Sequence, residues 1–381
     1  APVRVPLARL TFHQDERIAA RAEEDLDRLR RDFSAWIGPN LRRAIEPAAG
    51  TEYGWREAVA FDASVPKPAE ELLLRAMADT TLMRASVFLF GRGALVSLGD
   101  LPVGGARVSL LGSQHGKSVY RLSLRTRARE TFDIAINVAE DLSAPALREE
   151  IRWLLAAGAP PPLVETFGGY YPEHGIFTEE FIPGETVERQ VGRLERQGEG
   201  RRLKHVWPFL GWTALSAHVD FWDRTGRRVA LRHPSLAAFI VPSHDYQTGA
   251  RLVSIADRSP CERFEELLDR FQLAFVDTVE STRPELRGGI SDSIFFSAPV
   301  EALGLDRARP LLEELAGGPR GPAVEAFLAK VRAGGFTPRA VHFAVRRYRR
   351  WLAVNPGATP EACGATLSEL WGTYRLADLE S

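Results

Sequence analysis

The spacing of apolar residues divides the chain into a helical start, a strand-rich middle and a mostly helical end. Over residues 15–36 the apolar side chains recur close to every 3.6 residues, which predicts an amphipathic helix. A second helix is expected at 68–77. Beyond it, two short apolar runs flank the turn Gly91-Arg-Gly, which predicts a hairpin. We therefore predict a helical N-terminal region over residues 1–80.

The middle of the chain contains short strand-like runs joined by turn residues. Around Tyr120, apolar and polar residues alternate with a period of two. A helix is predicted at 145–157, with Pro145 in its first turn and apolar residues on one face. A further strand at 176–182 ends at Pro183-Gly184. We predict three antiparallel strands within 107–138, with the helix packed beside them.

The last part of the chain is mostly helical. Helices are predicted at 203–223, at 262–279 and after about residue 305, and two short apolar runs interrupt them within 229–253. The Gly/Pro-rich segment that begins at Gly317 is the best candidate for an internal linker. A small sheet with one helix, followed by a larger helical part, is an α+β arrangement. We predict a β-rich lobe over 81–183 and a helical lobe over 184–381.

Composition narrows the class of protein. Lys and Arg number 49 and Asp and Glu 50, so the formal charge is −1 and nucleic acid or an anionic membrane is disfavoured as a partner. Two cysteines are too few for a disulfide framework or a four-ligand zinc site, which favours a reducing compartment. The most apolar run, 207–219, is shorter than the roughly 20 residues that span a bilayer. We expect a cytoplasmic protein.

Lysine is rare in this chain. Only four of the 49 basic residues are lysine, so arginine is the default cation. Lys117 lies in the segment Leu111-Gly-Ser-Gln-His-Gly-Lys-Ser-Val-Tyr-Arg-Leu, between two predicted strands. A phosphate-binding P-loop does not fit, because three residues separate Gly112 from Gly116 where four are needed, and a strand follows instead of a helix.

The alternative is the glycine-rich hairpin of kinases, and the order of the following segments favours it. Ile134-Ala-Ile-Asn137 stands where kinases carry V-A-I-K, and a helix with two adjacent glutamates follows. Phe177 to Thr186 resembles an interlobe hinge, and Leu231 to Val241 resembles a catalytic loop. Val253-Ser-Ile-Ala-Asp257-Arg occupies the place of the metal-binding segment. Over 107–280 the chain resembles the protein-kinase-like fold, in its aminoglycoside-phosphotransferase and choline-kinase branch.

This resemblance implies a two-lobed kinase-like fold that binds ATP and Mg²⁺. The candidate metal ligand is Asp257, which could equally be a turn aspartate. Positions implied in nucleotide binding lie on the hairpin, on the helix and on the strand before the hinge. They are Gly112, Gln114, Gly116, Lys117, Ser118, Glu149, Glu150 and Glu180.

The sequence departs from the family at the catalytic positions. Asn137 replaces the strand lysine, and with His233 as the motif histidine the catalytic aspartate position is Ser235. No Asp or Asn occurs within 231–241. The with-no-lysine kinases move the phosphate-contacting lysine to the last glycine position of the hairpin, where this chain has Lys117. Glu149 or Glu150 is then expected to orient it. A solvated loop lysine is the alternative.

Three functional hypotheses follow. The first is a pseudokinase-type regulatory or accessory module that binds a nucleotide and acts on a protein partner. The second is an atypical ATP-dependent phosphotransferase or nucleotidyltransferase that uses Lys117 and Asp257 on a small-molecule acceptor. The third is a non-catalytic α+β interaction domain. His218, Asp220 and Asp223 lack the spacing of a metal site and are interpreted as a polar helix end.

Overall fold

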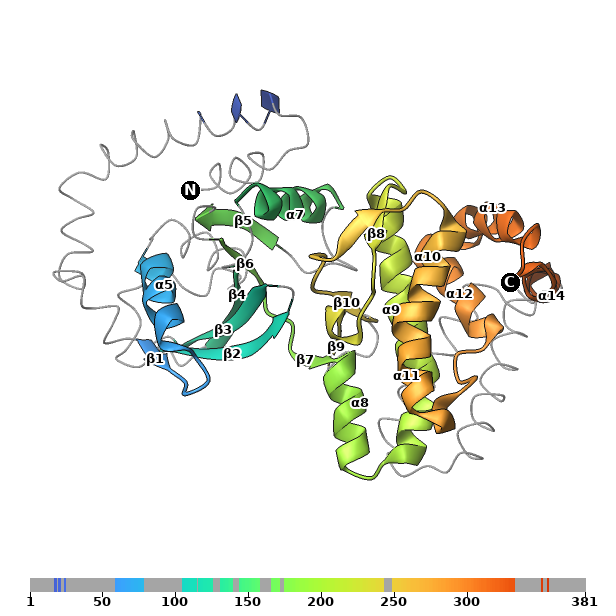
Figure 1. Ribbon diagram of the computed structural model, residues 1–381, viewed down its shortest axis with the longest axis horizontal. Helices are drawn as coiled ribbons and strands as arrows, with labels where there is room; N and C mark the ends of the chain where they lie inside the picture. The colour runs from blue at the N-terminus through green and yellow to red at the C-terminus, as the bar shows by residue number, and fades with distance from the viewer. Residues whose placement is uncertain are drawn as a thin grey trace. The chain divides into compact units, whose positions relative to one another are not determined.

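The computed structural model describes two compact units. It covers residues 59–78, 105–114, 116–125, 131–139, 144–157, 166–171, 175–242 and 249–332, with isolated positions at 17, 18, 20, 21, 24, 351 and 355. The first unit ends at Phe181 and the second continues from Ile182 (Figure 1). The predicted hairpin around Gly91 lies outside the described residues, as does the helix at 15–36 apart from five of these isolated positions.

A mixed six-stranded sheet forms the first unit, in the order β1-β2-β3-β4-β6-β5. Its first pair of strands, β1 and β2, is parallel, and every other pair is antiparallel. The strands are β1 (Val59–Phe61), β2 (Ala106–Gln114), β3 (Lys117–Arg125), β4 (Thr131–Val138), β5 (Thr166–Tyr171) and β6 (Ile176–Glu180). Helix α7 (Ala144–Ala156) connects β4 to β5 and lies beside β5 (Figure 1).

This unit confirms the α+β class and the three antiparallel strands predicted within 107–138. Helix α5 (Lys67–Ala78) confirms the helix predicted at 68–77. The assignment of residues 1–80 to a helical region is wrong at 59–61, which form β1 and pair with β2 from Ala106 to Val108. Three residues are too few to show a period, and their partner is distant in the sequence, so local pattern did not identify this strand.

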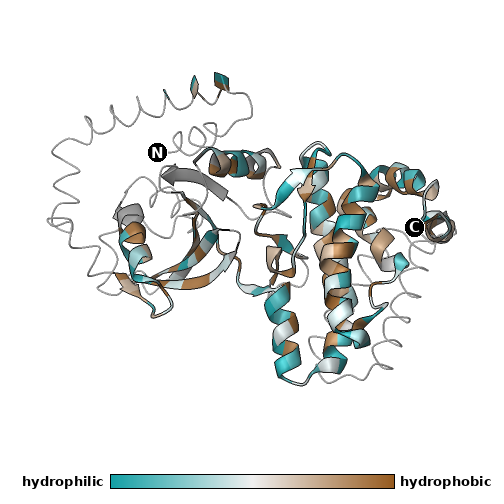
Figure 2. Cartoon of the chain, in the orientation of Figure 1, coloured by the Kyte–Doolittle hydropathy of each residue, from teal (hydrophilic) through white to brown (hydrophobic). Residues whose placement is uncertain are grey.

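Alternation along β3 and β4 builds the core of the sheet. Tyr120, Leu122 and Leu124 are buried on one face, and Ile134 and Ile136 lie opposite two of them on β4. The residues of β3 that alternate with them, Val119, Arg121 and Ser123, are partly exposed, whereas Lys117 at the start of the strand is buried. Figure 2 shows the resulting change between hydrophobic and hydrophilic positions along these strands. A sheet with one fully buried face fixes the register, because a slip by one residue would turn every apolar side chain outward.

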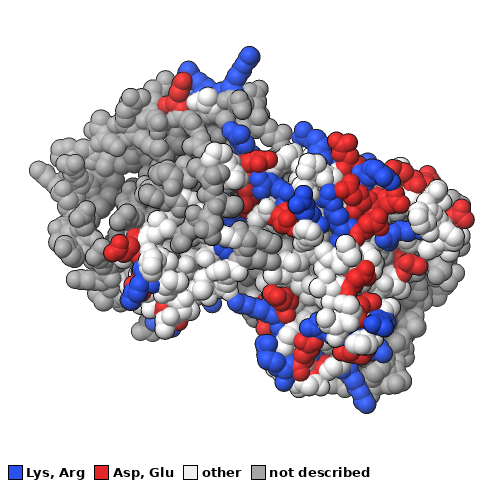
Figure 3. All heavy atoms as spheres, viewed as in Figure 1, with Lys and Arg blue, Asp and Glu red and all other residues white. Residues whose placement is uncertain are grey.

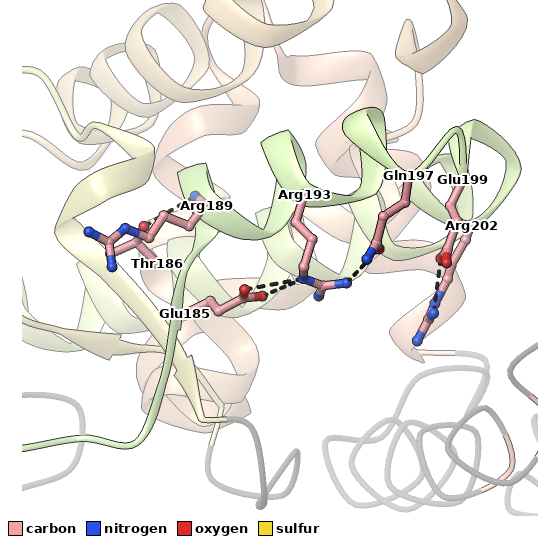
Figure 4. Close-up of polar contacts among 7 residues, drawn as sticks. All are labelled: Glu185, Thr186, Arg189, Arg193, Gln197, Glu199 and Arg202. Carbon is pink, nitrogen blue, oxygen red and sulfur yellow. Dashed lines mark hydrogen bonds and ion pairs between the residues drawn. The ribbon is translucent and has the colours of Figure 1, made fainter. Parts of the chain in front are cut away.

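The second unit begins with a short strand and a capped helix, β7 (Gly184–Thr186) and α8 (Val187–Arg196). The Thr186 hydroxyl accepts a hydrogen bond from the Arg189 backbone N–H at 3.2 Å, which satisfies one of the free donors at the helix start. The Arg193 guanidinium donates to both oxygens of Glu185 at 3.1 and 2.9 Å (Figure 4). These contacts join the strand to the helix at the surface.

Helices make up most of the second unit, as expected. Long helix α9 (Gly200–Arg224) packs against α12 (Asp292–Leu303), and α10 (Phe264–Phe271) continues through a π-helical turn, η4 (Gln272–Asp277), into α11 (Thr278–Thr282). Phe271 and Phe275 stack at 4.6 Å, and Phe275 also stacks on Trp207 of α9 at 5.6 Å. These rings form the centre of the unit's core.

The segment at Gly317 is not a linker. It is a tight turn between α13 (Leu305–Ala316) and α14 (Gly321–Arg332), which pack against each other. The Gly318 and Gly321 backbone N–H groups donate to Leu315 and Gly318 carbonyls, respectively. Glycine and proline mark both turns and linkers, so their presence alone did not distinguish the two.

Two small antiparallel sheets carry the segment that resembles a catalytic loop. Strand β8 (Val229–Leu231) pairs with β11 (Arg258–Pro260), and β9 (Phe239–Pro242) lies between β10 (Arg251–Leu252) and β7. A short 3₁₀ turn, η3 (Leu236–Ala238), leads into β9. The chain between β8 and η3 therefore leaves one small sheet and enters the other.

Charged side chains on the described surface of the second unit are mixed rather than segregated. Figure 3 shows basic and acidic groups side by side, and several form ion pairs, such as Arg224 with Asp220 at 3.0 Å. Such exposed pairs contribute little stability individually. Within the described ranges, no helix is both long enough and apolar enough to cross a membrane.

The tight turn before β6 generates a stability prediction. Gly175 has a φ of +65°, and a Cβ added there would lie 2.4 Å from the Ala139 carbonyl oxygen. Gly175→Ala should lower the free energy of unfolding by about 2–4 kcal/mol, because a left-handed conformation is combined with a backbone clash. Urea denaturation followed by circular dichroism measures this.

Gly198→Ala is the matched control. Gly198 has nearly the same φ of +68°, but nothing lies within 4 Å of an added Cβ. It should cost only about 1 kcal/mol, the conformational part alone. Equal losses in the two variants would show that the contact with Ala139 is unimportant.

Candidate functional site

Lys117 opens strand β3, immediately after the turn at Gly116, whose φ is 69°. The expected loop over 112–116 is shorter than predicted, because β2 extends through Gln114 and pairs Gln114 with Lys117. Lys117 is only 4% exposed. The interpretation of this residue as a solvated loop lysine is therefore wrong. Period-two alternation marked the strand but could not locate its first residue.

The ammonium group of Lys117 forms a buried ion pair with Glu150 of α7. Nζ lies 3.1 Å from Oε1, and the two side chains are 3% and 1% exposed. Nζ also lies 5.2 Å from the centre of the Phe177 ring, in a cation–π contact. Of the two glutamates considered from the sequence, the structure pairs Lys117 with Glu150, whereas Glu149 is exposed.

Asn137, where the resemblance to kinases would place a lysine, lies on the same face of the sheet. It is opposite Val119 on β3 and opposite Phe177 on β6, so its side chain shares a face with Lys117. Its amide Nδ2 donates to Glu179 Oε2 at 2.7 Å, and both residues are buried. Asn137 Oδ1 is buried and has no hydrogen-bond partner within the part of the chain that the structure describes.

The other hairpin candidates lie in strands β2 and β3 or in the turn between them. Gly112 is in strand β2, just after a register shift from Leu110, and is exposed. Ser118 Oγ lies 2.8 Å from Ser113 Oγ in a cross-strand hydrogen bond. The backbone of Gln114 belongs to β2. Of the members of this group whose side chains the structure describes, only Lys117 is buried.

Glu180 is not brought together with Lys117. It pairs with Ile134, and alternation places it on the opposite face of the sheet from Asn137 and Phe177. The residue on the cluster's face is Glu179, which the sequence did not single out. Adjacent glutamates in a strand differ only in which face they occupy, and that depends on the register with β4.

The energetics of the Lys117–Glu150 pair argue against a purely stabilising role. Removing two charges from water costs several kcal/mol per ion, and their attraction rarely exceeds that cost. An apolar pair of similar volume would be about as stable. Breaking the pair by removing one partner, however, leaves a buried uncompensated charge. Such ion pairs in buried polar clusters are frequent at functional sites.

In the second unit, the structure joins His233 to Asp257. The Asp257 Oδ2 atom accepts the His233 backbone N–H at 2.8 Å and lies 2.9 Å from His233 Nδ1. Ser235 lies at the start of η3, where its side chain makes no capping hydrogen bond. Asp257, the candidate metal ligand, thus already holds a turn in place. With one of its oxygens engaged and no Asp or Asn within 231–241, these residues do not fit Mg²⁺ by themselves.

His218 anchors this segment from α9, a role that the sequence did not reveal. The residue is completely buried, and its Nε2 accepts the Leu231 backbone N–H at 3.0 Å. Burial lowers the pKa of His218 from 6.5 to about 3, and the positive charge of Arg270 lowers it further. The predicted polar helix end is wrong for this residue, because the face that α9 buries is decided by tertiary packing.

Neither the arrangement of possible metal ligands nor comparison with known proteins assigns a function to the chain. Across the described ranges, no group of three or more His, Cys, Asp or Glu side chains is arranged to hold a metal ion. Compared with known proteins, the chain matches no family model and no curated sequence.

The buried ion pair generates a stability prediction. Lys117→Met should lower the free energy of unfolding by about 3–5 kcal/mol, because Glu150 would remain buried without its counter-charge. Neutralising that charge in Lys117→Met/Glu150→Gln should recover at least half of the loss. Denaturant titrations of both variants measure this. A loss within about 0.5 kcal/mol for the single variant would contradict the burial of the pair.

His218 generates a prediction about pH. Its folded pKa of about 3 lies below its ordinary value of 6.5, so its contribution to stability is complete above pH 6.5 and is lost as the pH falls toward 3. This residue alone should cost about 2 kcal/mol of stability between pH 7 and pH 5.

Other groups also titrate between pH 5 and pH 7, so the test compares the pH dependence of stability in a variant with that in the parent protein. His218→Gln keeps a hydrogen-bond acceptor near Leu231 but cannot be protonated. Urea titrations at pH 7 and pH 5 should show about 2 kcal/mol less pH dependence in His218→Gln than in the parent protein. The same pH dependence in both proteins would refute the assignment.

Proposed function

We propose that this chain is a pseudokinase-type module that binds a nucleoside polyphosphate and regulates a protein partner in the cytoplasm. The observation that carries the proposal is the buried Lys117–Glu150 pair. Active kinases need an ion pair between a lysine of the small-lobe sheet and a glutamate of the adjacent helix, because the lysine contacts the nucleotide phosphates. Here strand β3 and helix α7 supply the two residues.

Three features of the first unit support this assignment. The strands follow the expected order, with a glycine turn between β2 and β3, then β4, a helix with the glutamate, and β5 and β6. Asn137, at the usual lysine position, is neutral and bonded to Glu179. Lys117 is the one buried lysine among the three lysines whose side chains the structure describes. Arginine is the default cation, so a buried lysine here favours a chemical role.

The residues of the second unit support the proposal that the chain does not catalyse phosphoryl transfer. Phosphoryl transfer needs a carboxylate that accepts the proton of the attacking hydroxyl, and positions 231–241 provide none. Asp257, the remaining candidate, is bonded through one oxygen to His233. We therefore derive no step that runs through a metal ion or through phosphoryl transfer on an acceptor substrate.

The residues of the first unit fit a nucleotide better than a metal. When bound, the nucleotide would supply phosphate oxygens, and Lys117 would hold one of them. One hydrogen bond of its ammonium group goes to Glu150. A lysine ammonium has three donors, so a ligand oxygen can bind without breaking the ion pair. Glu150 would orient the lysine for that contact.

Calorimetry with ATP tests the proposal. A charge-assisted hydrogen bond contributes roughly 1.5–3 kcal/mol, so Lys117→Met/Glu150→Gln should bind ATP about ten- to a hundredfold more weakly than Glu150→Gln. This comparison keeps Glu150 neutral in both proteins and removes only the lysine. Adding Asn137→Lys to the double variant should recover part of the affinity, because it restores a cation on the same face of the sheet.

Lys67→Met is the matched control. Lys67 belongs to the same unit but is exposed on α5, where it pairs with Glu70. Its removal should leave ATP affinity unchanged. Equal affinity with and without Lys117 would contradict the assigned role. If the parent protein binds no ATP, the chain is instead a non-catalytic interaction domain, and robust phosphate transfer would favour an atypical transferase.

A further inference from the structure

His233 and Asp257 form an oriented pair in the second unit, which the proposed function does not use. Asp257 Oδ2 accepts two hydrogen bonds from the same residue, at 2.8 Å from its backbone nitrogen and 2.9 Å from its Nδ1. His233 is thus held at two points, one on its backbone and one on its ring. Its side chain is nevertheless 66% exposed, whereas that of Asp257 is 25% exposed.

The backbone around this pair is fixed by contacts from three elements. Strand β8 pairs with β11, with Leu231 opposite Arg258. The Arg232 backbone N–H donates to the Asp257 carbonyl oxygen at 2.7 Å, and the Leu231 N–H donates to buried His218. The ring position therefore does not depend on a ligand. Sites whose groups are held in advance need little reorganisation when they react.

The hydrogen bond to Asp257 selects the reactive form of the ring. A carboxylate accepts only, so Nδ1 carries the proton and the lone pair of the neutral imidazole lies on Nε2. No hydrogen bond from a described residue engages Nε2. The side chain is 66% exposed, so a small reagent in solution can approach the ring. A positive charge that develops on the ring would be stabilised by the adjacent carboxylate.

The nearby charge favours an anionic reaction partner. Arg232 precedes His233 and is exposed, and Arg258 lies across the strand pair from Leu231. Arg232 and Arg258 adjoin His233 and Asp257 in the sequence, so this short segment carries two cationic side chains and one carboxylate. A local excess of basic residues of this kind favours the approach of an anion. If His233 accepted a proton from a bound substrate, its ring would be expected to be enclosed. Its side chain is instead 66% exposed.

We propose that His233 is a phosphoryl-accepting residue, modified at Nε2 by a phosphoryl donor with a nitrogen or carboxylate leaving group. In the step, the Nε2 lone pair attacks phosphorus and the bond from phosphorus to the leaving group breaks. With phosphoramidate as donor, the ammonium nitrogen leaves as ammonia with the bonding electron pair. The phosphoryl group stays on Nε2. The ring becomes positively charged, because its proton stays on Nδ1, where it is hydrogen-bonded to Asp257.

Reaction with phosphoramidate tests the proposal directly, because this small donor needs no binding pocket. Intact mass spectrometry and peptide mapping should show acid-labile phosphate on His233, with ³¹P NMR placing it on Nε2. The rate should be about tenfold higher than for N-acetylhistidine amide under the same conditions, since the ring is oriented and its developing charge is stabilised. Buried His218 should remain unmodified.

Variants separate the roles of the neighbours. His233→Gln should abolish the modification, and Asp257→Asn should lower the rate toward that of the free amide. Because Asp257→Asn also weakens a backbone contact, Arg232→Gln offers a second variant on an exposed side chain, and it should lower the rate severalfold. A rate for parent His233 equal to that of N-acetylhistidine amide, or phosphate on Nδ1, would overturn the proposal, whatever the result for ATP.

Discussion

A cation buried in the first unit must be neutralised there, and this requirement links the sheet to its helix. Lys117 is 4% exposed, so its charge is stable only with a counter-charge in contact. Glu150 supplies it from α7. The pair therefore constrains the register of β3 and the position of α7 together. Since an apolar pair would cost less desolvation, we infer that the charge is retained for what it binds.

In the second unit, a buried neutral histidine has the comparable structural role. His218 accepts a backbone N–H from β8 and packs against Phe271 with ring centres 6.2 Å apart. Burial keeps it unprotonated over the ordinary pH range, because its pKa is lowered to about 3. The aromatic core around Phe271 and Phe275 thus supports the short strand that leads to His233. Packing and hydrogen bonding hold this segment in place, although residues 231–241 contain no carboxylate.

The two groups most relevant to chemistry differ in exposure. Lys117 is enclosed with Glu150, and Asn137 lies on the same face of the sheet. His233 is 66% exposed, and Asp257 orients its ring through Nδ1. Each proposal rests on contacts within one unit, so the two can fail independently.

The sequence determined the α+β class, the three antiparallel strands and the helix of the first unit, and the long helices of the second. These follow from hydrophobic periodicity, which local residues carry. It also directed attention to Lys117 and to the paired glutamates. Only the tertiary structure decided that Glu150 is the partner, that Glu179 rather than Glu180 faces Asn137, and that Asp257 binds His233. These choices depend on strand register and on contacts between distant segments, and local spacing does not determine either of them.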